Sequence, residues 1–558
     1  MKNCALLVPA VLLLGVDRLY GFVPLHHHGT VNRLSTNSAL QPCGERMKNA
    51  GWILSSALQE TDINADSFDF DDDDDDDVYS GRSYEEFYKE FDALANQKTS
   101  GIAQQAEALF DEMLEAYLAT DDAGFWPNAT VYNKIIGMHA WSFAEDGADK
   151  AEHYLNRMED ASVELVARPN LKTYLNVMDA WTNRDNPDKV KEILLRAETR
   201  YQQTQDDAVK PNRLMYNRLI KAWMKSGRED AAQQAESILQ FLTNEYEKGN
   251  EELMPDSKSF IQVMRCFRNR QDETSVDKVT SLLQQMSRLY RISGEEAMEP
   301  NIQVHNEYIA TIGENPFVEN NSQQAEQYLY QLMEEGRENE ILRPNFVTFR
   351  HVIYSYRMRG NNNNKKQLQK GLAFKIEKLL ELQKALLGRI DNRNYEAALQ
   401  VISKSYDPKK VPVCERLLQQ MKEGGPALDP SQASYNALLN ACAHPMTRDN
   451  AKRTMAIAVE ALNELRENVF GGANFISYAY FLKCCSRLLP RDKSDALVRN
   501  VFGKCCQDGQ VAKFVLMEFL EAASEELAAD VLGGDPQEGV KIPRRWSRNV
   551  RDKRQLLG

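Results

Sequence analysis

The chain has 558 residues, a net charge of −14 and 42% hydrophobic residues. This length predicts several domains or one long repeat array. We see no stretch near the roughly 20 apolar residues that a membrane helix needs, so we expect no membrane insertion of the mature form. The nine Cys include no CxxC pair, and we expect buried thiols rather than a zinc site or a disulfide framework.

The first residues have the composition of targeting segments. Residues 1–21 open with Lys2 and continue with an apolar core about as long as that of a signal peptide. Residues 22–59 are rich in Ser, Thr, Asn and Ala, as transit peptides are, and Glu45 is their only acid. With Phe22 beside the join, the two segments resemble the bipartite presequences of algae with complex plastids. We therefore expect a plastid (chloroplast) location, with a mitochondrial presequence or a secretory signal as alternatives.

An acidic run follows. Residues 60–77 contain eleven acids and no base, so that they cannot bury their charges. We expect residues 60–82 to be a disordered linker. Most of the net negative charge lies in this run, and the remaining chain is only mildly acidic. A broad basic surface is therefore not expected, and any binding of nucleic acid requires locally placed groups.

One pattern recurs from residue 127 to residue 485. A Pro and a small polar residue come first, an aromatic residue or His follows four positions after the polar one, and apolar residues then continue at helical spacing. Such a polar residue is a good helix N-cap, and each copy is followed by a second amphipathic helix, as at 231–242. Helix pairs of this kind bury their apolar faces by stacking on neighbours. The polar residues of the copies stand at 128, 170, 212, 256, 301, 345, about 391, 431 and 474.

The copies carry a family resemblance. The third one has Tyr216-Asn217, Leu219-Ile220, Ala235, Ile238, Leu239 and then Pro255-Asp256, and it resembles the pentatricopeptide repeat. That family implies an all-α, right-handed superhelical solenoid of antiparallel helix pairs, which we expect over residues 83–524. The intervals here are 40–46 residues, whereas the family unit has about 35. The additional residues lie mainly after the second helix, as at 197–210, and are expected to lengthen that helix or to form a loop.

The resemblance also implies how RNA is recognised. Family members bind one base per repeat, through the residue after the first-helix aromatic and the last residue of the unit. By the family's pattern, Asn with Asn favours cytosine and Asn with Asp favours uracil. Alternatively, these Asn residues cap helices or bridge neighbouring repeats and touch no base. The implied RNA-binding pairs are Asn133 with Asn170, Asn217 with Asp256, Asn306 with Asn345, and Asn436 with Asn474; the other first positions hold Leu175, Ile261, Arg350, Glu396 and Ala479.

Residues 525–558 are expected to be a linker and a basic tail. Residues 541–554 hold seven Lys or Arg around Trp546. This tail would either grip phosphates while Trp546 stacks on a base, or pack back on the last repeat with Trp546 buried.

The sequence as a whole favours a binding protein. We expect an organellar, monomeric protein that binds single-stranded RNA and acts in RNA stability, processing or translation, with other organellar RNA-processing proteins as candidate partners. The alternative is a scaffold that binds a polypeptide and has no RNA role. After residue 485 there is no HxE with CxxC and no clustered acidic set. We therefore expect no enzyme activity, catalytic residue, metal or cofactor.

Overall fold

The computed structural model describes residues 81–97, 101–142, 144–160, 167–357, 370–445, 450–469, 472–533 and 542–555. Within these ranges the chain forms α-helices and short 3-10 helices and no strand, which confirms the all-α prediction. None of the described helices is both long enough and apolar enough to cross a membrane. The presequence-like segments and the acidic run lie outside the described residues. The chain divides into two compact units, residues 1–266 and 267–558.

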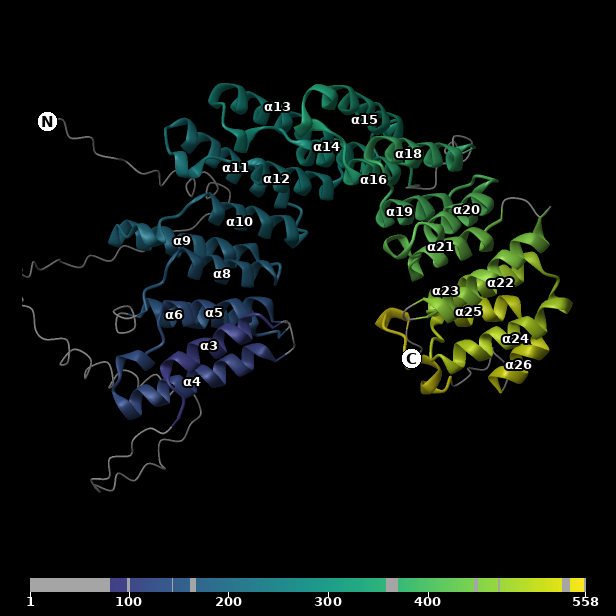
Figure 1. The fold of residues 1–558 in the computed structure, drawn as a ribbon, viewed down its shortest axis with the longest axis horizontal. Coiled ribbons are helices and arrows are strands. Elements are labelled where there is room, and N and C mark those ends of the chain that lie inside the picture. The colour runs from purple at the N-terminus through teal and green to yellow at the C-terminus, as the bar shows by residue number, and fades with distance from the viewer. Residues whose placement is uncertain are drawn as a thin grey trace, which may run out of the picture. The chain divides into compact units, whose positions relative to one another are not determined.

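The first unit is a stack of helix pairs (Figure 1). In each pair the first helix (the A helix) packs on the second (the B helix) and on the A helix of the next pair. Thus α5 contacts α6 and α8, and α8 contacts α9 and α10. The helices are α3 (Tyr84–Ala95), α4 (Ile102–Thr120), α5 (Ala129–Trp141), α6 (Gly147–Glu159), α8 (Leu171–Thr182), α9 (Pro187–Thr204), α10 (Arg213–Ser226) and α11 (Ala231–Glu247), and α12 (Ser257–Arg270) contains the boundary.

The second unit repeats this plan. The A helices α14, α16, α19, α21, α23 and α25 contact one another in that order, and the B helices α15, α18, α20, α22 and α24 each lie against two A helices, as α22 does with α21 and α23. The array continues past residue 524 as α26. The helices are α13 (Ser275–Ser293), α14 (Ile302–Glu314), α15 (Asn321–Glu338), α16 (Phe346–Ser355), α18 (Leu372–Leu387), α19 (Asn392–Ser403), α20 (Lys410–Glu423), α21 (Gln432–Ala443), α22 (Ala451–Asn468), α23 (Phe475–Leu488), α24 (Arg491–Gln507), α25 (Lys513–Ala522) and α26 (Glu525–Leu532).

The apolar spacing and the small residues of the sequence explain how the helices pack. The expected apolar face of α10 is buried, with Met215 and Trp223 at 0% and 4% exposure. On the B helices, Ala151, Ala235 and Ala325 are fully buried. A side chain this small lets two helix backbones approach closely, so these alanines hold each B helix against its neighbours.

In several repeats a 3-10 turn follows the B helix. In the second copy, α9 runs on to Thr204, about two turns past residue 197, and a 3-10 turn follows at Asp207–Val209. Similar turns precede the next A helix in several other copies, and the turn's apolar residue is often buried, as Val209 is. At Gly424 an added Cβ would lie 2.5 Å from Cδ1 of Leu428, a residue of such a turn. The turn therefore folds back onto the end of its own B helix.

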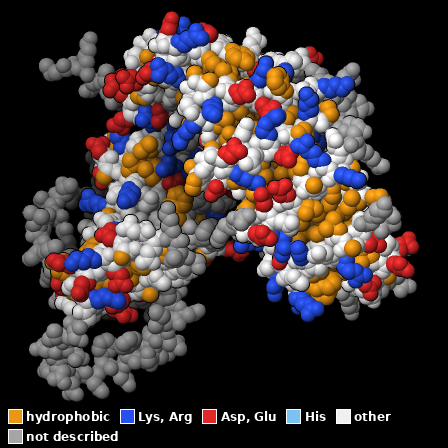
Figure 2. Space-filling view, turned by 45° about the vertical axis from the view of Figure 1, so that its right-hand side comes forward, with side chains coloured by type: hydrophobic (Ala, Val, Ile, Leu, Met, Phe, Trp, Pro, Cys, Tyr) orange, Lys and Arg blue, Asp and Glu red, His pale blue; other side chains and the backbone are white. Residues whose placement is uncertain are grey.

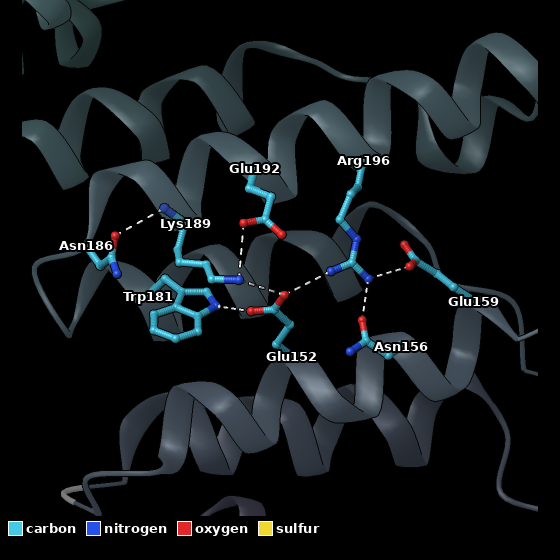
Figure 3. A network of polar contacts seen from close by, with 8 residues as sticks. All are labelled: Glu152, Asn156, Glu159, Trp181, Asn186, Lys189, Glu192 and Arg196. Carbon is cyan, nitrogen blue, oxygen red and sulfur yellow. Dashed lines mark hydrogen bonds and ion pairs between the residues drawn. The ribbon is translucent and has the colours of Figure 1, made fainter. Parts of the chain in front are cut away.

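Polar contacts hold neighbouring pairs together on the B-helix side (Figure 3). Between α6, α8 and α9, the carboxylate of Glu152 accepts hydrogen bonds from Nε1 of Trp181 at 2.8 Å and from Nη1 of Arg196 at 3.1 Å. Arg196 also donates to Oδ1 of Asn156 at 2.6 Å and to the Glu159 carboxylate. One acid thus joins three helices, because an A-helix indole and a B-helix guanidinium from the next pair share it.

The cysteines are part of the core. Cys484, Cys485 and Cys505 are fully buried, and the described cysteines are free thiols, as the sequence predicts. Burial raises the pKa of Cys485 to about 12, so its nucleophilic thiolate form is scarce at neutral pH. Among the described residues, no group of three or more His, Cys, Asp and Glu is placed to hold a metal ion.

Candidate functional site

The structure brings together all four residue pairs implied by the family resemblance. In each pair the first residue lies on an A helix, one position after the aromatic residue, and its side chain reaches the residue that caps the next A helix. The carboxamide nitrogen donates to the cap oxygen in every case. The distances are 3.4 Å for Asn133 to Asn170, 3.3 Å for Asn217 to Asp256, 3.3 Å for Asn306 to Asn345, and 3.3 Å for Asn436 to Asn474.

The second residue of each pair is also the N-cap of its own helix. Asn170 Oδ1 accepts from the backbone N–H of Thr173 at 3.2 Å, and Asp256 Oδ1 accepts from that of Ser259 at 2.9 Å. Asn345 and Asn474 cap α16 and α23 in the same way. Such caps are worth about 1 kcal/mol each. The cap residue is therefore held in place by its own helix and offers a fixed acceptor to the preceding repeat.

The first residues are buried in these contacts. The exposed fraction is 5% for Asn133, 1% for Asn217, 3% for Asn306 and 9% for Asn436. The bridging role that the sequence left open as the alternative is thus the arrangement in the structure.

Two positions that depart from the family pattern make the same bridge with other chemistry. Arg350 Nη1 lies 3.9 Å from Oδ2 of Asp391, the cap of α19. The Glu396 carboxylate accepts a hydrogen bond from Oγ of Ser431, the cap of α21. Sequence reasoning missed these two bridges. In both cases the A-helix side chain is chemically complementary to the cap of the next A helix, since Arg pairs with Asp and Glu accepts from Ser. This complementarity could have been found in the sequence. The apolar Leu175, Ile261 and Ala479 have no side-chain polar atom with which to form such a bridge.

A third side chain completes the four Asn bridges. Three residues after each cap stands a Ser or Thr: Thr173, Ser259, Thr348 and Ser477. We call the A-helix Asn, the following cap and this hydroxyl residue an Asn clasp. In all four clasps the hydroxyl oxygen accepts from the cap's backbone N–H, at 3.0 to 3.2 Å. Each clasp therefore ties one A helix to the first turn of the next.

Basic residues gather next to one of these clasps. Asn217, Lys221 and Lys225 stand four residues apart and share one face of α10. Arg218 Nε lies 2.8 Å from Oδ1 of Asp179, and Lys221 Nζ lies 3.7 Å from the same oxygen. Burial lowers the pKa of Lys221; Asp179 opposes this effect, whereas Arg218, Lys225 and Lys258 add to it.

We call Arg218, Lys221, Lys225 and Lys258 the α10 basic cluster. Asp179 contacts this cluster, and Oδ1 of Asp185 lies 4.0 Å from Lys225 Nζ. Four basic side chains thus meet these two acids, and the cluster carries more positive than negative charge. Elsewhere the charges are mixed: over the face drawn in Figure 2, Lys and Arg lie among Asp and Glu with hydrophobic side chains between them. The cluster is thus a local basic site in a chain with a net negative charge.

The basic tail packs back on the last helices. The backbone N–H of Val511 donates to the Trp546 carbonyl at 2.8 Å, and Ser547 Oγ donates to the Val511 carbonyl at 2.7 Å. The Trp546 ring meets that of Phe502 edge-on at 6.0 Å and is half-buried. Arg548 Nη2 donates to the Gln507 carbonyl at the end of α24. Of the two arrangements predicted for the tail, this is the one in which it caps the array.

Stacked helix pairs whose A helices contact one another within each unit define an α-helical repeat protein. No protein-family model and no curated protein matches this chain. Among solved structures, it is similar to the pentatricopeptide repeat protein PPR10 from maize, with 16% identity, 81% of this chain and 63% of that chain covered, and a TM-score of 0.42. It is also similar to PPR10 in complex with an 18-nt psaJ RNA element, with 17% identity, 80% and 59% covered, and a TM-score of 0.44. The chain spans about three-fifths of the length of those chains, and the likeness concerns the fold alone.

Proposed function

We propose that this chain binds single-stranded RNA along its A helices. The observation that carries the proposal is the α10 basic cluster, two of whose members, Lys221 and Lys225, share a helix face with Asn217 in a chain with a net negative charge. Cations attract the phosphate backbone, and carboxamides on the A helices can offer donors and acceptors to the edges of unpaired bases. A bound strand would lay its phosphates on the cluster and its bases over the A helices.

Such binding needs neither a cofactor nor catalytic groups. Occupying a transcript site shields it from nucleases and keeps it unpaired, which affects RNA stability, processing or translation. A single copy of the chain suffices for this, and other RNA-processing proteins would act on the strand that it holds.

Binding of a fluorescent 20-nucleotide single-stranded RNA of random sequence, followed by anisotropy at two salt concentrations, tests the proposal. Replacing Lys221, Lys225 and Lys258 with Gln should weaken binding. It should also reduce the slope of log affinity against log salt by about 2, since each phosphate contact on a single strand contributes about 0.7. The matched control replaces three exposed lysines of the B helix α18 with Gln, and it should change the slope little: Lys375, Lys378 and Lys384.

The result for the wild-type protein separates the two candidate functions. If it binds no RNA even at low salt, the RNA proposal fails. The polypeptide-binding scaffold then takes its place, because a mildly acidic array suits a basic peptide.

We further propose that the protein works in the plastid, on the basis of its first 59 residues. A fluorescent reporter carrying residues 1–59 should enter that organelle. Replacing Phe22 with Asp should leave the reporter outside the innermost membranes. Import that is unaffected by this change would reject the role given to Phe22, and delivery to mitochondria would reject the plastid location.

A further inference from the structure

The four Asn clasps differ in one hydrogen bond. In two of them the Asn carboxamide oxygen accepts from the Ser hydroxyl, at 2.7 Å from Ser259 to Asn217 and at 2.6 Å from Ser477 to Asn436. In the other two, the Thr hydroxyl lies 3.3 Å from the cap oxygen, and the carboxamide oxygens of Asn133 and Asn306 are buried without a hydrogen-bond partner. We call these two kinds the Ser clasps and the Thr clasps.

A hydroxyl has one proton and can donate only one strong hydrogen bond. In the Ser clasps the hydroxyl donates to the Asn carboxamide oxygen, which lies closer to it than the cap oxygen does. The distances from the hydroxyl to the cap oxygen are 2.9 Å for Asp256 and 3.0 Å for Asn474. A buried acceptor without a donor costs free energy, since nothing replaces the water it has lost. A Thr clasp, in which the Asn points at the cap and its carboxamide oxygen has no donor, is therefore less stable by this cost than a Ser clasp.

The remaining bond of the Thr clasps is also weak. Their carboxamide nitrogens reach the cap oxygens at 3.4 and 3.3 Å, longer than the usual 2.7–3.2 Å for N–H···O. The cap residues Asn170 and Asn345 are half-buried, whereas Asn133 and Asn306 are 5% and 3% exposed. Turning the Asn carboxamide outward past the cap thus gives up one long hydrogen bond and offers the oxygen a donor.

We infer that the residue three positions after the cap decides which Asn reads a bound base, and that only the Thr clasps do so. This inference rests on the proposed RNA binding. A carboxamide oxygen accepts from an exocyclic amino group, which cytosine, adenine and guanine carry and uracil lacks. Asn133 and Asn306 therefore select an amino-bearing base, while Asn217 and Asn436 keep their oxygens on Ser. The pair of Asn436 with Asn474 has the same two residue types as the Thr clasps, so the hydroxyl residue and not the pair separates the two classes.

The test is selection from a pool of random 20-nucleotide single-stranded RNAs, with the bound fraction sequenced. The wild-type protein should enrich amino-bearing bases over uracil at two positions. Thr173→Ser should reduce the enrichment at one of them by about 2- to 10-fold, the range expected for one net hydrogen bond. Thr348→Ser should do so at the other, and Ser259→Thr should create enrichment at a third. Affinity for the unselected pool should stay the same in all three variants.

Thermal denaturation excludes a purely structural explanation. Thr173→Ser gives Asn133 a donor, worth about 1 kcal/mol, and removes one buried methyl group, which costs about as much. Its stability should therefore stay within about 1 kcal/mol of that of the wild-type protein, and a larger loss contradicts the inference. Unchanged enrichment in Thr173→Ser and Thr348→Ser, with RNA still bound, overturns the inference and leaves the proposed function standing. A wild-type protein that binds no RNA rejects both.

Discussion

Replacing Asn217 with Val removes one Asn clasp while keeping a side chain of similar size. The carboxamide of Asn217 accepts from Ser259 at 2.7 Å and donates to Asp256 at 3.3 Å, and the residue is 1% exposed. Val can make neither bond. The substitution therefore isolates what the clasp contributes to the junction of α10 with the first turn of α12.

The magnitude follows from what the partners keep. Ser259 still reaches Asp256 at 2.9 Å, and Asp256 still accepts from the Ser259 N–H and pairs with Arg213 at 3.3 Å. No partner is left without a hydrogen bond, so the loss is that of two ordinary hydrogen bonds. We expect destabilisation by about 1–2 kcal/mol. For a cooperative unit of this size, that lowers the melting temperature by about 2–8 °C.

Thermal denaturation followed by circular dichroism measures this effect. The matched control is Asn244→Val, because Asn244 lies exposed on α11 in the same unit and has a surface hydrogen bond from Gln240. This control should change stability by no more than about 0.5 kcal/mol. Combining Asn217→Val with Ser259→Ala in a double-mutant cycle should give a coupling energy of about 1 kcal/mol.

Two results would refute this reasoning. One is a melting temperature for Asn217→Val no lower than that of Asn244→Val. The other is a coupling energy of zero with Ser259→Ala, which would mean that the 2.7 Å contact stabilises nothing.

Three further predictions concern other parts of the fold. Gly313→Ala should destabilise the protein by about 1–3 kcal/mol, because the added Cβ would lie 2.6 Å from the Cβ of Ser355. Gly503→Ala should stabilise it by about 0.5–1 kcal/mol, because the added Cβ would have no atom within 4 Å. Thermal melts that give the opposite order of stability would contradict this prediction. Burial lowers the pKa of Lys410 to about 8, so that between pH 8 and about 10.5 the unfolded chain binds more protons than the folded one. The free energy of unfolding should therefore rise with pH in this range. Thermal melts of Lys410→Met should lack this rise. Trp546→Ala should speed hydrogen exchange in α24 and α25 without changing the salt slope of RNA binding; a change in slope instead would assign the tail to phosphate contacts.

Much of the fold was predictable because its signals are local. A small polar residue such as Asn170 caps a helix through atoms three residues away, and the apolar spacing in α10 sets the face that becomes buried. Ala235 marks close packing for the same reason. These features depend on the sequence within one helix, where spacing alone determines which side chains share a face.

The candidate site was predictable only as pairs of residues. Their internal bond was not, because Asn133 and Asn170 stand 37 residues apart and meet only through the packing of one A helix on the next. The same holds for Glu396 with Ser431. In the sequence, Glu396 departs from the repeat pattern, and its bond to Ser431 becomes visible only when α19 and α21 are packed together. The difference between Ser259 and Thr173 depends on hydroxyl direction within a packed interface, and spacing carries no information about that direction.

The Asn clasp also sets where one repeat can be cut from the array and joined to another. If a repeat is transferred with both of its ends placed at the Pro before a cap, its A-helix Asn will meet the cap and the hydroxyl residue of the recipient array instead of its own. An exchangeable unit should instead extend through the third residue of the following A helix, as from Arg213 through Ser259. Chimeras joined at that later point should keep their junctions intact, and a change at one A-helix position will require a matched change some forty residues further along the chain.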